Sequence, residues 1–314
     1  MKRGIFDTLK RGAENALSNW QLSLIRFIEI LAFCALTVLG IIVALVPIFV
    51  SLGIHLSEIN DADDMHSAMT TLAEQWPVFI WFFAGMFVMF FFFVFVHSYV
   101  EAGCARLFVD ADRAAGPAAT GQKGRYRVFS ASRWFAGARE GGWRVFWIYN
   151  FAWSVAALIL LIPLIPVAAL MLAFRGNPAV SAGVGCLGML IVLLFGIVLG
   201  LVTGMWTNRA IANWAVERGT ARHALGSGWR AVKGDFGRHL LIALAIIVVA
   251  LAGSSAVSSV TSFGSFSSIH GHNIYNVVFA PVRMIGTILS WAISSLISSW
   301  YLASYSALSV ENKP

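Results

Sequence analysis

The sequence is poor in charged residues and in cysteine. Asp, Glu, Lys and Arg together make up 12% of its 314 residues, about half the share of an average soluble domain. Because 59% of the residues are hydrophobic, neither an ordinary soluble enzyme with a polar surface nor a disordered chain fits this composition. The three cysteines form no CxxC pair, which indicates neither a disulfide framework nor a zinc knuckle.

Catalytic sequence motifs are also missing. The chain contains no HExxH, GxSxG, Walker or CxxC sequence. One GxGxxG string, at Gly183, Gly185 and Gly188, opens a hydrophobic segment, whereas a dinucleotide site needs a preceding strand in a soluble βαβ unit. We interpret these glycines as helix-packing residues. We therefore expect a protein that is not an enzyme and needs no cofactor.

Long apolar segments are what the sequence has in abundance. A transmembrane helix needs about 20 mostly apolar residues. Six stretches meet this requirement, namely approximately Phe27–Ile54, Pro77–Val100, Trp147–Ala173, Val184–Trp206, Leu240–Val260 and Met284–Ala307. The first lies too far from the basic start of the chain, and is too long, for a cleavable signal peptide. The sequence predicts an all-α, polytopic membrane protein whose residues 1–314 form a single integral membrane domain.

The basic residues indicate the orientation of these spans. In a six-span arrangement, 20 of the 22 Lys and Arg residues fall on one side, together with both ends of the sequence. The first loop on the other side, His55–Trp76, carries several acids and no Lys or Arg. The positive-inside rule then predicts that the N- and C-termini are cytoplasmic. The net charge of +7 is thus explained without nucleic acid.

The ends of the even-numbered spans resemble one another. Each segment starts with an aromatic residue, keeps small residues in its middle and ends with Val and an acid. The three segments start at Tyr99, Trp206 and Trp300. Three further aromatic residues each follow a basic, helix-compatible stretch, namely Trp20, Trp143 and Phe236. The pattern predicts three parallel repeats, approximately 5–112, 125–219 and 221–312, each an amphipathic cytoplasmic helix followed by a helical hairpin.

Small residues mark two of the spans. Gly196, Gly200 and Gly204 form a doubled GxxxG pattern in the fourth span. The equivalent residues of the sixth span are Ser290, Ser294 and Ser298. Because small residues four apart let helix backbones approach closely, we predict that these two spans form the close-packed centre. The Phe-rich second span then faces lipid, a partner chain or a bulky apolar ligand, and lipid is the simplest of these.

Two pairs of ionisable residues lie inside the apolar spans. His97 and Glu101 are one helical turn apart in the second span, and Arg26 and Glu29 form a similar pair in the first. Ionisable groups at membrane depth are costly and suggest function, here a proton or ion pathway. Structural ion pairing is the alternative that we favour, because all four residues lie near the cytoplasmic interface, where long side chains reach water.

Four histidines belong to the predicted external loops. His55, His66, His270 and His272 lie near several carboxylates. Imidazoles and carboxylates can bind zinc or copper, provided that the two loops meet. Solvated loop histidines are the simpler interpretation.

Basic and aromatic residues alternate just before the third span. The basic and Trp residues concerned are Arg125, Arg127, Arg133, Trp134, Arg139, Trp143 and Arg144. This composition can bind single-stranded nucleic acid. Its position next to a span favours an interfacial helix on anionic lipid instead, and we expect no nucleic-acid partner.

The segment 224–240 and the apolar span after it resemble a known repeated element. It reads ALGSGWRAVKGDFGRHL, and 130–147 and 8–21 are looser copies. This element is similar to that of bacterial six-helix proteins akin to the membrane domain of glycerophosphoryl diester phosphodiesterases and to the YciC-like inner-membrane family. The resemblance implies a polytopic module of the bacterial inner membrane. The phosphodiesterase barrel is absent, so neither its activity nor any functional residue carries over.

Three hypotheses for function follow. The first is a non-enzymatic membrane protein that interacts with anionic lipid or serves as a structural or accessory subunit, as a homo-oligomer or in a larger complex. The second is a transporter or channel for a small solute or ion. The third is a membrane protein that binds metal through the external histidines.

Overall fold

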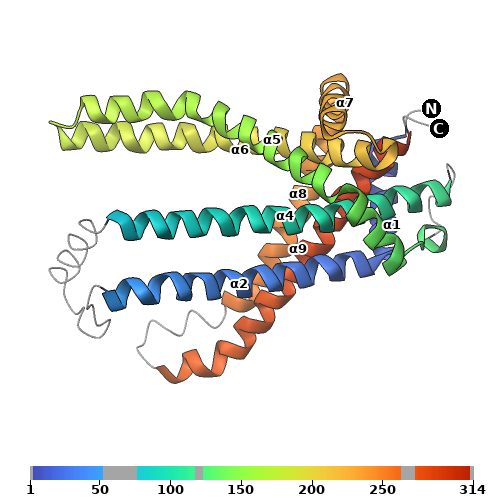
Figure 1. Ribbon diagram of the computed structural model, residues 1–314, viewed down its shortest axis with the longest axis horizontal. Coiled ribbons are helices and arrows are strands. Elements are labelled where there is room, and N and C mark those ends of the chain that lie inside the picture. Colours follow the sequence, from blue (N-terminus) through green and yellow to red (C-terminus); the bar gives the residue numbers. More distant parts are fainter. Residues whose placement is uncertain (1–2, 52–75, 117–122, 263–272, 312–314) are drawn as a thin grey trace. The chain divides into compact units, whose positions relative to one another are not determined.

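The computed structural model describes residues 3–51, 76–116, 123–262 and 273–311 (Figure 1). No strand occurs among these residues, of which 93% are helical. The elements are α1 (Ile5–Ser18), α2 (Trp20–Ser51), α4 (Trp76–Ala115), the 3-10 helix η1 (Lys123–Tyr126), α5 (Ala131–Ala173), α6 (Pro178–Glu217), α7 (Ala221–Gly234), α8 (Phe236–Ser262) and α9 (Asn273–Glu311). Six of them, α2, α4, α5, α6, α8 and α9, are long and apolar enough to cross a membrane. The predicted all-α fold with six spans is therefore confirmed.

The chain divides into two compact units, residues 26–97 and the remainder. The smaller unit is a hairpin made by α2 from Arg26 onward and α4 as far as His97. Inside it, the rings of Phe33 and Phe93 stack with their centroids 4.5 Å apart. Several other Phe side chains of α4 are exposed, among them Phe83 and Phe87, as a lipid-facing surface requires.

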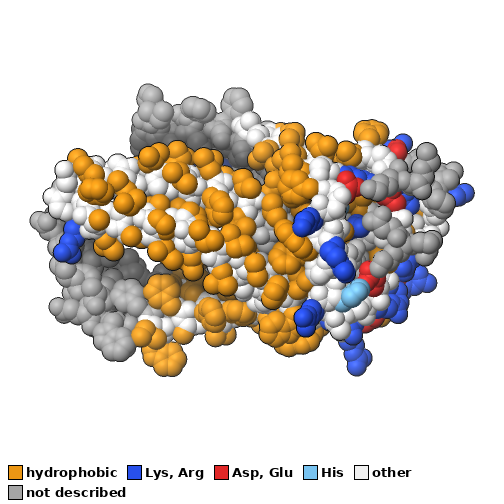
Figure 2. Space-filling view, turned by 90° about the horizontal axis from the view of Figure 1, so that it is seen from above, with side chains coloured by type: hydrophobic (Ala, Val, Ile, Leu, Met, Phe, Trp, Pro, Cys, Tyr) orange, Lys and Arg blue, Asp and Glu red, His pale blue; other side chains and the backbone are white. Residues whose placement is uncertain are grey.

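The larger unit contains a buried core, which we call the headpiece. It consists of α1, η1, α7 and the segments 98–115, 131–149, 204–217, 236–246 and 299–311. Trp214, Tyr126, Tyr305 and Phe108 are among its fully buried side chains. Away from the headpiece, α5, α6, α8 and α9 expose many apolar side chains, among them Leu158, Leu187 and Leu251. Figure 2 shows this contrast on one face, where Lys and Arg side chains gather at one end.

The amphipathic stretches that precede the hairpins are built in two ways. Asn19 separates α1 from α2, and Asp235 separates α7 from α8. By contrast, α5 runs without a break through 43 residues. Around the position that corresponds to Asn19 and Asp235, α5 carries Gly141 and Gly142, which have no polar side chain to compete for backbone hydrogen bonds. Both pack tightly, since a β-carbon on Gly141 would lie 1.9 Å from the Trp214 ring.

Two tryptophans fasten the ends of spans to separate amphipathic helices. The indole Nε1 of Trp206 donates to the Leu225 carbonyl at 2.9 Å, and that of Trp300 donates to the Leu9 carbonyl at 2.8 Å. In the repeat alignment Trp206 corresponds to Trp300. Leu225 and Leu9 also correspond, because each precedes the aligned aromatic residue of its repeat by eleven positions. Matching hydrogen bonds thus hold α7 on α6 and α1 on α9.

Candidate functional site

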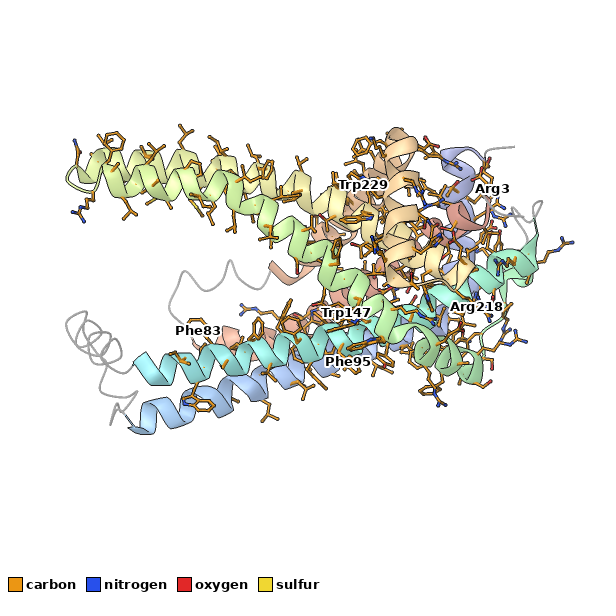
Figure 3. The ribbon with its side chains drawn as sticks, turned by 45° about the horizontal axis from the view of Figure 1, so that its top comes forward. Arg3, Phe83, Phe95, Trp147, Arg218 and Trp229 are labelled. Atoms are coloured by element: carbon orange, nitrogen blue, oxygen red, sulfur yellow. The ribbon has the colours of Figure 1, made fainter. Side chains whose placement is uncertain are left out.

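A long apolar groove lies between α5, α6 and α7. Its volume is about 920 Å³. Ile159 and Leu199 line the part farthest from the headpiece, whereas Trp147 and Trp206 line the near part. Figure 3 labels Trp147 of α5 and Trp229 of α7, which both line the groove. Such a groove accommodates an apolar molecule rather than a polar substrate.

Close packing fixes α7 over the headpiece end of this groove. A β-carbon on Gly228 would lie 2.9 Å from the Ala210 backbone, so the two helices touch there. Asn213 of α6 donates to the Ser227 hydroxyl at 3.1 Å. At the start of α7, the Thr220 hydroxyl accepts from the His223 amide and caps the helix. These contacts hold α7 against α6 at this end of the groove.

A second hollow adjoins the groove and is basic. Its volume is about 570 Å³, and it is lined by Thr220, Arg222, His223, Gly226 and Arg230, which we call the basic shelf. Arg222 and Gly226 line the groove as well. His223 pairs with Glu217 at 2.9 Å. Neither Arg222 nor Arg230 makes an ion pair with any described residue. The shelf therefore presents two uncompensated guanidinium groups.

A third hollow, of about 620 Å³, corrects the packing prediction. Gly200 and Gly204 of α6 line it together with Ser294 and Ser298 of α9. A β-carbon on either of these glycines would meet no atom within 4 Å, and one on Gly196 would come no closer than 3.6 Å to another side chain. The predicted close contact is thus absent at Gly200 and Gly204, because the two faces are separated by space. Ser290, the remaining residue of that stripe, is half-buried.

One contact among the ionisable residues of the first hairpin joins a member of each predicted one-turn pair. Within the smaller unit, the His97 Nδ1 atom lies 2.8 Å from the Glu29 Oε1 atom, so the contact joins two helices. Glu29 is buried and His97 is about one-third exposed. Arg26 is also buried, and Glu101, which belongs to the larger unit, is buried as well. Hydropathy could locate these residues but could not decide which helix face meets which.

Buried ion pairs in the headpiece are sites that sequence reasoning missed. Arg11 donates through Nε and Nη2 to one oxygen of Asp112, at 3.0 and 2.8 Å, and both side chains are almost fully buried. Arg238 pairs with Glu311 at 2.8 Å, and Glu311 also accepts from the Arg3 amide. Part of the basic charge is therefore internal and is neutralised by acids from distant helices.

The basic and aromatic segment before the third span includes η1 and the first turns of α5. Arg125, Arg127, Arg133 and Arg139 are exposed, and Arg144 is half-exposed. Trp143 is 54% exposed, whereas Trp134 packs its indole over Gly103. This surface is available to lipid headgroups.

The predicted metal ligands His55, His66, His270 and His272 lie outside the described residues. Among the residues that are described, no group of three or more His, Cys, Asp or Glu side chains could hold a metal ion. Metal binding by the external loops stays a prediction.

Comparison of the chain with protein-family models, with curated proteins and with solved structures finds no match in any of the three. The resemblance to the YciC-like family therefore stays an expectation from the sequence.

Proposed function

We propose that this integral membrane protein is non-enzymatic and binds lipid in the cytoplasmic leaflet of a bacterial inner membrane. The observation that carries the proposal is the groove between α5, α6 and α7. It runs from the spans to an amphipathic helix that exposes arginine. Lipid tails are apolar and the headgroups of this leaflet are often anionic. The two parts of the site match the two parts of a lipid.

The distribution of aromatic and basic side chains supports the cytoplasmic orientation. Trp143, Trp147 and Trp229 are each about half exposed, as is common where spans leave the membrane. Exposed arginines continue beyond them on η1 and α5. A face that carries this charge is attracted to the cytoplasmic leaflet.

The threefold repeat belongs to the same proposal. It is supported by the matching hydrogen bonds of Trp206 and Trp300. It is supported further by two tight helix contacts at corresponding positions. Gly228 meets Ala210, and Gly12 meets Ser304. In this arrangement the end of one hairpin docks on the amphipathic helix of the next repeat.

Retention of native lipid tests the proposed function. The protein is extracted into detergent, washed extensively, and analysed by native mass spectrometry with lipid identification. We expect phospholipid to remain bound in a defined stoichiometry. A protein that keeps no phospholipid after this treatment would overturn the proposal.

Ion or proton transport is a second candidate, favoured by the contact between Glu29 and His97. The contact bridges two apolar helices at 2.8 Å, and ionisable groups there suggest a pathway. Proton flux into liposomes should fall in the Glu29→Gln and His97→Ala variants. His223→Ala changes an exposed histidine of α7 and provides the control. Equal flux in all variants would remove this candidate.

A further inference from the structure

We infer that the groove and the basic shelf together form a site for one anionic phospholipid. An acyl chain would occupy the groove, and the phosphate would lie on Arg222 and Arg230. This inference rests on the proposed function and names the ligand class of the same site.

The length of the groove fits one leaflet. It is lined along α5 from Trp147 to Ile159. At a rise of 1.5 Å per residue these positions are about 18 Å apart. One leaflet contributes about 15 Å of hydrocarbon to the membrane core. An acyl chain that enters beside α7 thus ends near the depth of Ile159.

The lining of the groove suits a lipid tail. Apart from Thr203 and Arg222, the residues that line it are apolar or glycine. An acyl chain needs no hydrogen-bond partner along its length, and this lining offers almost none.

Charge supplies the selectivity. Moving a lipid tail from the bilayer into the groove gains little, because both surroundings are apolar. The phosphate gains more, since Arg222 and Arg230 have no ion-pair partner among the described residues. Guanidinium groups match phosphate geometry closely. Each basic residue near an anionic surface is worth about a fivefold preference. No acid lines the shelf, and Glu217, which contacts its His223, is paired with that side chain.

The corresponding positions of α1 lack this arrangement. In the repeat alignment Arg222, Gly226 and Arg230 become Phe6, Lys10 and Glu14. Glu14 is buried, at 6% exposure. An acid in place of Arg230 repels a phosphate, so α1 offers no equivalent shelf. Of the two separate amphipathic helices, only α7 carries the phosphate-binding pair.

Gly226 connects the two hollows. It lines both, and a β-carbon placed on it would meet no atom within 4 Å. A larger side chain at this position therefore enters the path from shelf to groove rather than the protein core. It also favours the helix, because glycine is the weaker helix former. Gly226→Leu should block the lipid and leave the fold intact.

The experiment uses the full chain in nanodiscs of phosphatidylethanolamine that contain a minor share of phosphatidylglycerol. Native mass spectrometry counts the phosphatidylglycerol that stays with the released protein. Wild-type protein should retain one molecule, enriched about 25-fold over its share in the disc. Arg222→Gln and Arg230→Gln should each lower the enrichment about fivefold. Lys233→Gln, on the same helix but outside both hollows, should not.

The groove is tested by a matched pair of leucine substitutions. Gly226→Leu should abolish retention, whereas Gly234→Leu, also open to space on α7, should keep it. Thermal unfolding of each variant in detergent verifies that the fold is intact. Retention of phosphatidylethanolamine and phosphatidylglycerol in proportion to the disc would overturn the inference and leave the proposed function standing. Equal retention in the two leucine variants, or a protein chain held at the groove instead of lipid, would also overturn it.

Discussion

Removal of Arg11 should destabilise the headpiece more than removal of any neighbouring charge. Its guanidinium binds Asp112 twice and donates to the Gly116 carbonyl at 2.9 Å, and it lies 5.5 Å from the centre of the Tyr126 ring. These contacts join α1 to the end of α4. Arg11→Met removes the charge but keeps an apolar chain of similar length.

The expected magnitude follows from the burial of the partner. The Asp112 side chain is fully buried. Arg3 also pairs with it, but Arg3 is partly exposed and lies 3.4 Å away, farther than Arg11 at 2.8 Å. Leaving one member of a buried ion pair alone costs about 3–5 kcal/mol. Replacing both members by apolar residues is often neutral. The double variant with Arg11→Met and Asp112→Leu should therefore recover most of the loss.

Reversible unfolding in mixed micelles, followed by circular dichroism, measures these free energies. Lys10→Met is the matched control, because Lys10 is the exposed neighbour in the same helix, and it should leave the unfolding midpoint unchanged. The reasoning is refuted if Arg11→Met behaves like Lys10→Met, or if the double variant is no more stable than Arg11→Met alone.

Three further predictions concern the headpiece and its surroundings. Gly12→Ala should destabilise the protein by about 1–3 kcal/mol, because the new β-carbon would lie 2.1 Å from the Ser304 hydroxyl. Gly226→Ala is the control and should stabilise the protein slightly, because its β-carbon would meet no atom within 4 Å. Equal changes in the free energy of chemical unfolding for the two variants would contradict the packing at Gly12. Asn19→Ala should lower the free energy of unfolding by more than about 2 kcal/mol. The Asn19 side chain donates to the Tyr126 carbonyl at 2.7 Å and accepts from the backbone amides of Val128 and Phe129. An unchanged melting temperature would show that other contacts hold the segment 126–129. Burial raises the pKa of Tyr126 to about 12, above its value of about 10 in an unfolded chain. Stability that is complete below pH of about 10 should therefore fall as the pH rises towards about 12, and Tyr126→Phe should remove that component in urea unfolding titrated with pH.

Hydropathy predicts the spans because lipid leaves the chain few alternatives. Backbone groups in hydrocarbon must be satisfied within the segment, so a long apolar run can be assigned as a helix with little further information. The ends of the helices do not follow from the same rule. The second span was predicted to end at Val100, whereas α4 continues to Ala115. Beyond the apolar run the helix is buried in the headpiece, and hydropathy detects lipid contact rather than helical structure.

The ion pairs of the headpiece could not be predicted from the sequence. Arg11 and Asp112 are 101 positions apart, and no local pattern links them. The positive-inside count treats Arg11 and Arg238 as surface charges. Both are internal and paired in the structure. Counting basic residues still indicates orientation, because it depends on which loop holds them and not on which are solvated.

The glycines explain why a packing motif can be present without the packing. At two places in the headpiece, a small residue on each of two helices lies at the same level. Gly228 meets Ala210 and Gly12 meets Ser304, and in both places a β-carbon on the glycine would overlap its neighbour. Gly204 faces a hollow that α9 lines with Ser298, so small residues on both sides leave space instead of contact. In lipid, apolar burial gives helices little reason to associate, so contact depends on local shape. A β-carbon on Gly188 of α6 would lie 2.5 Å from Val167 of α5, whereas Gly204 on the same helix meets a hollow.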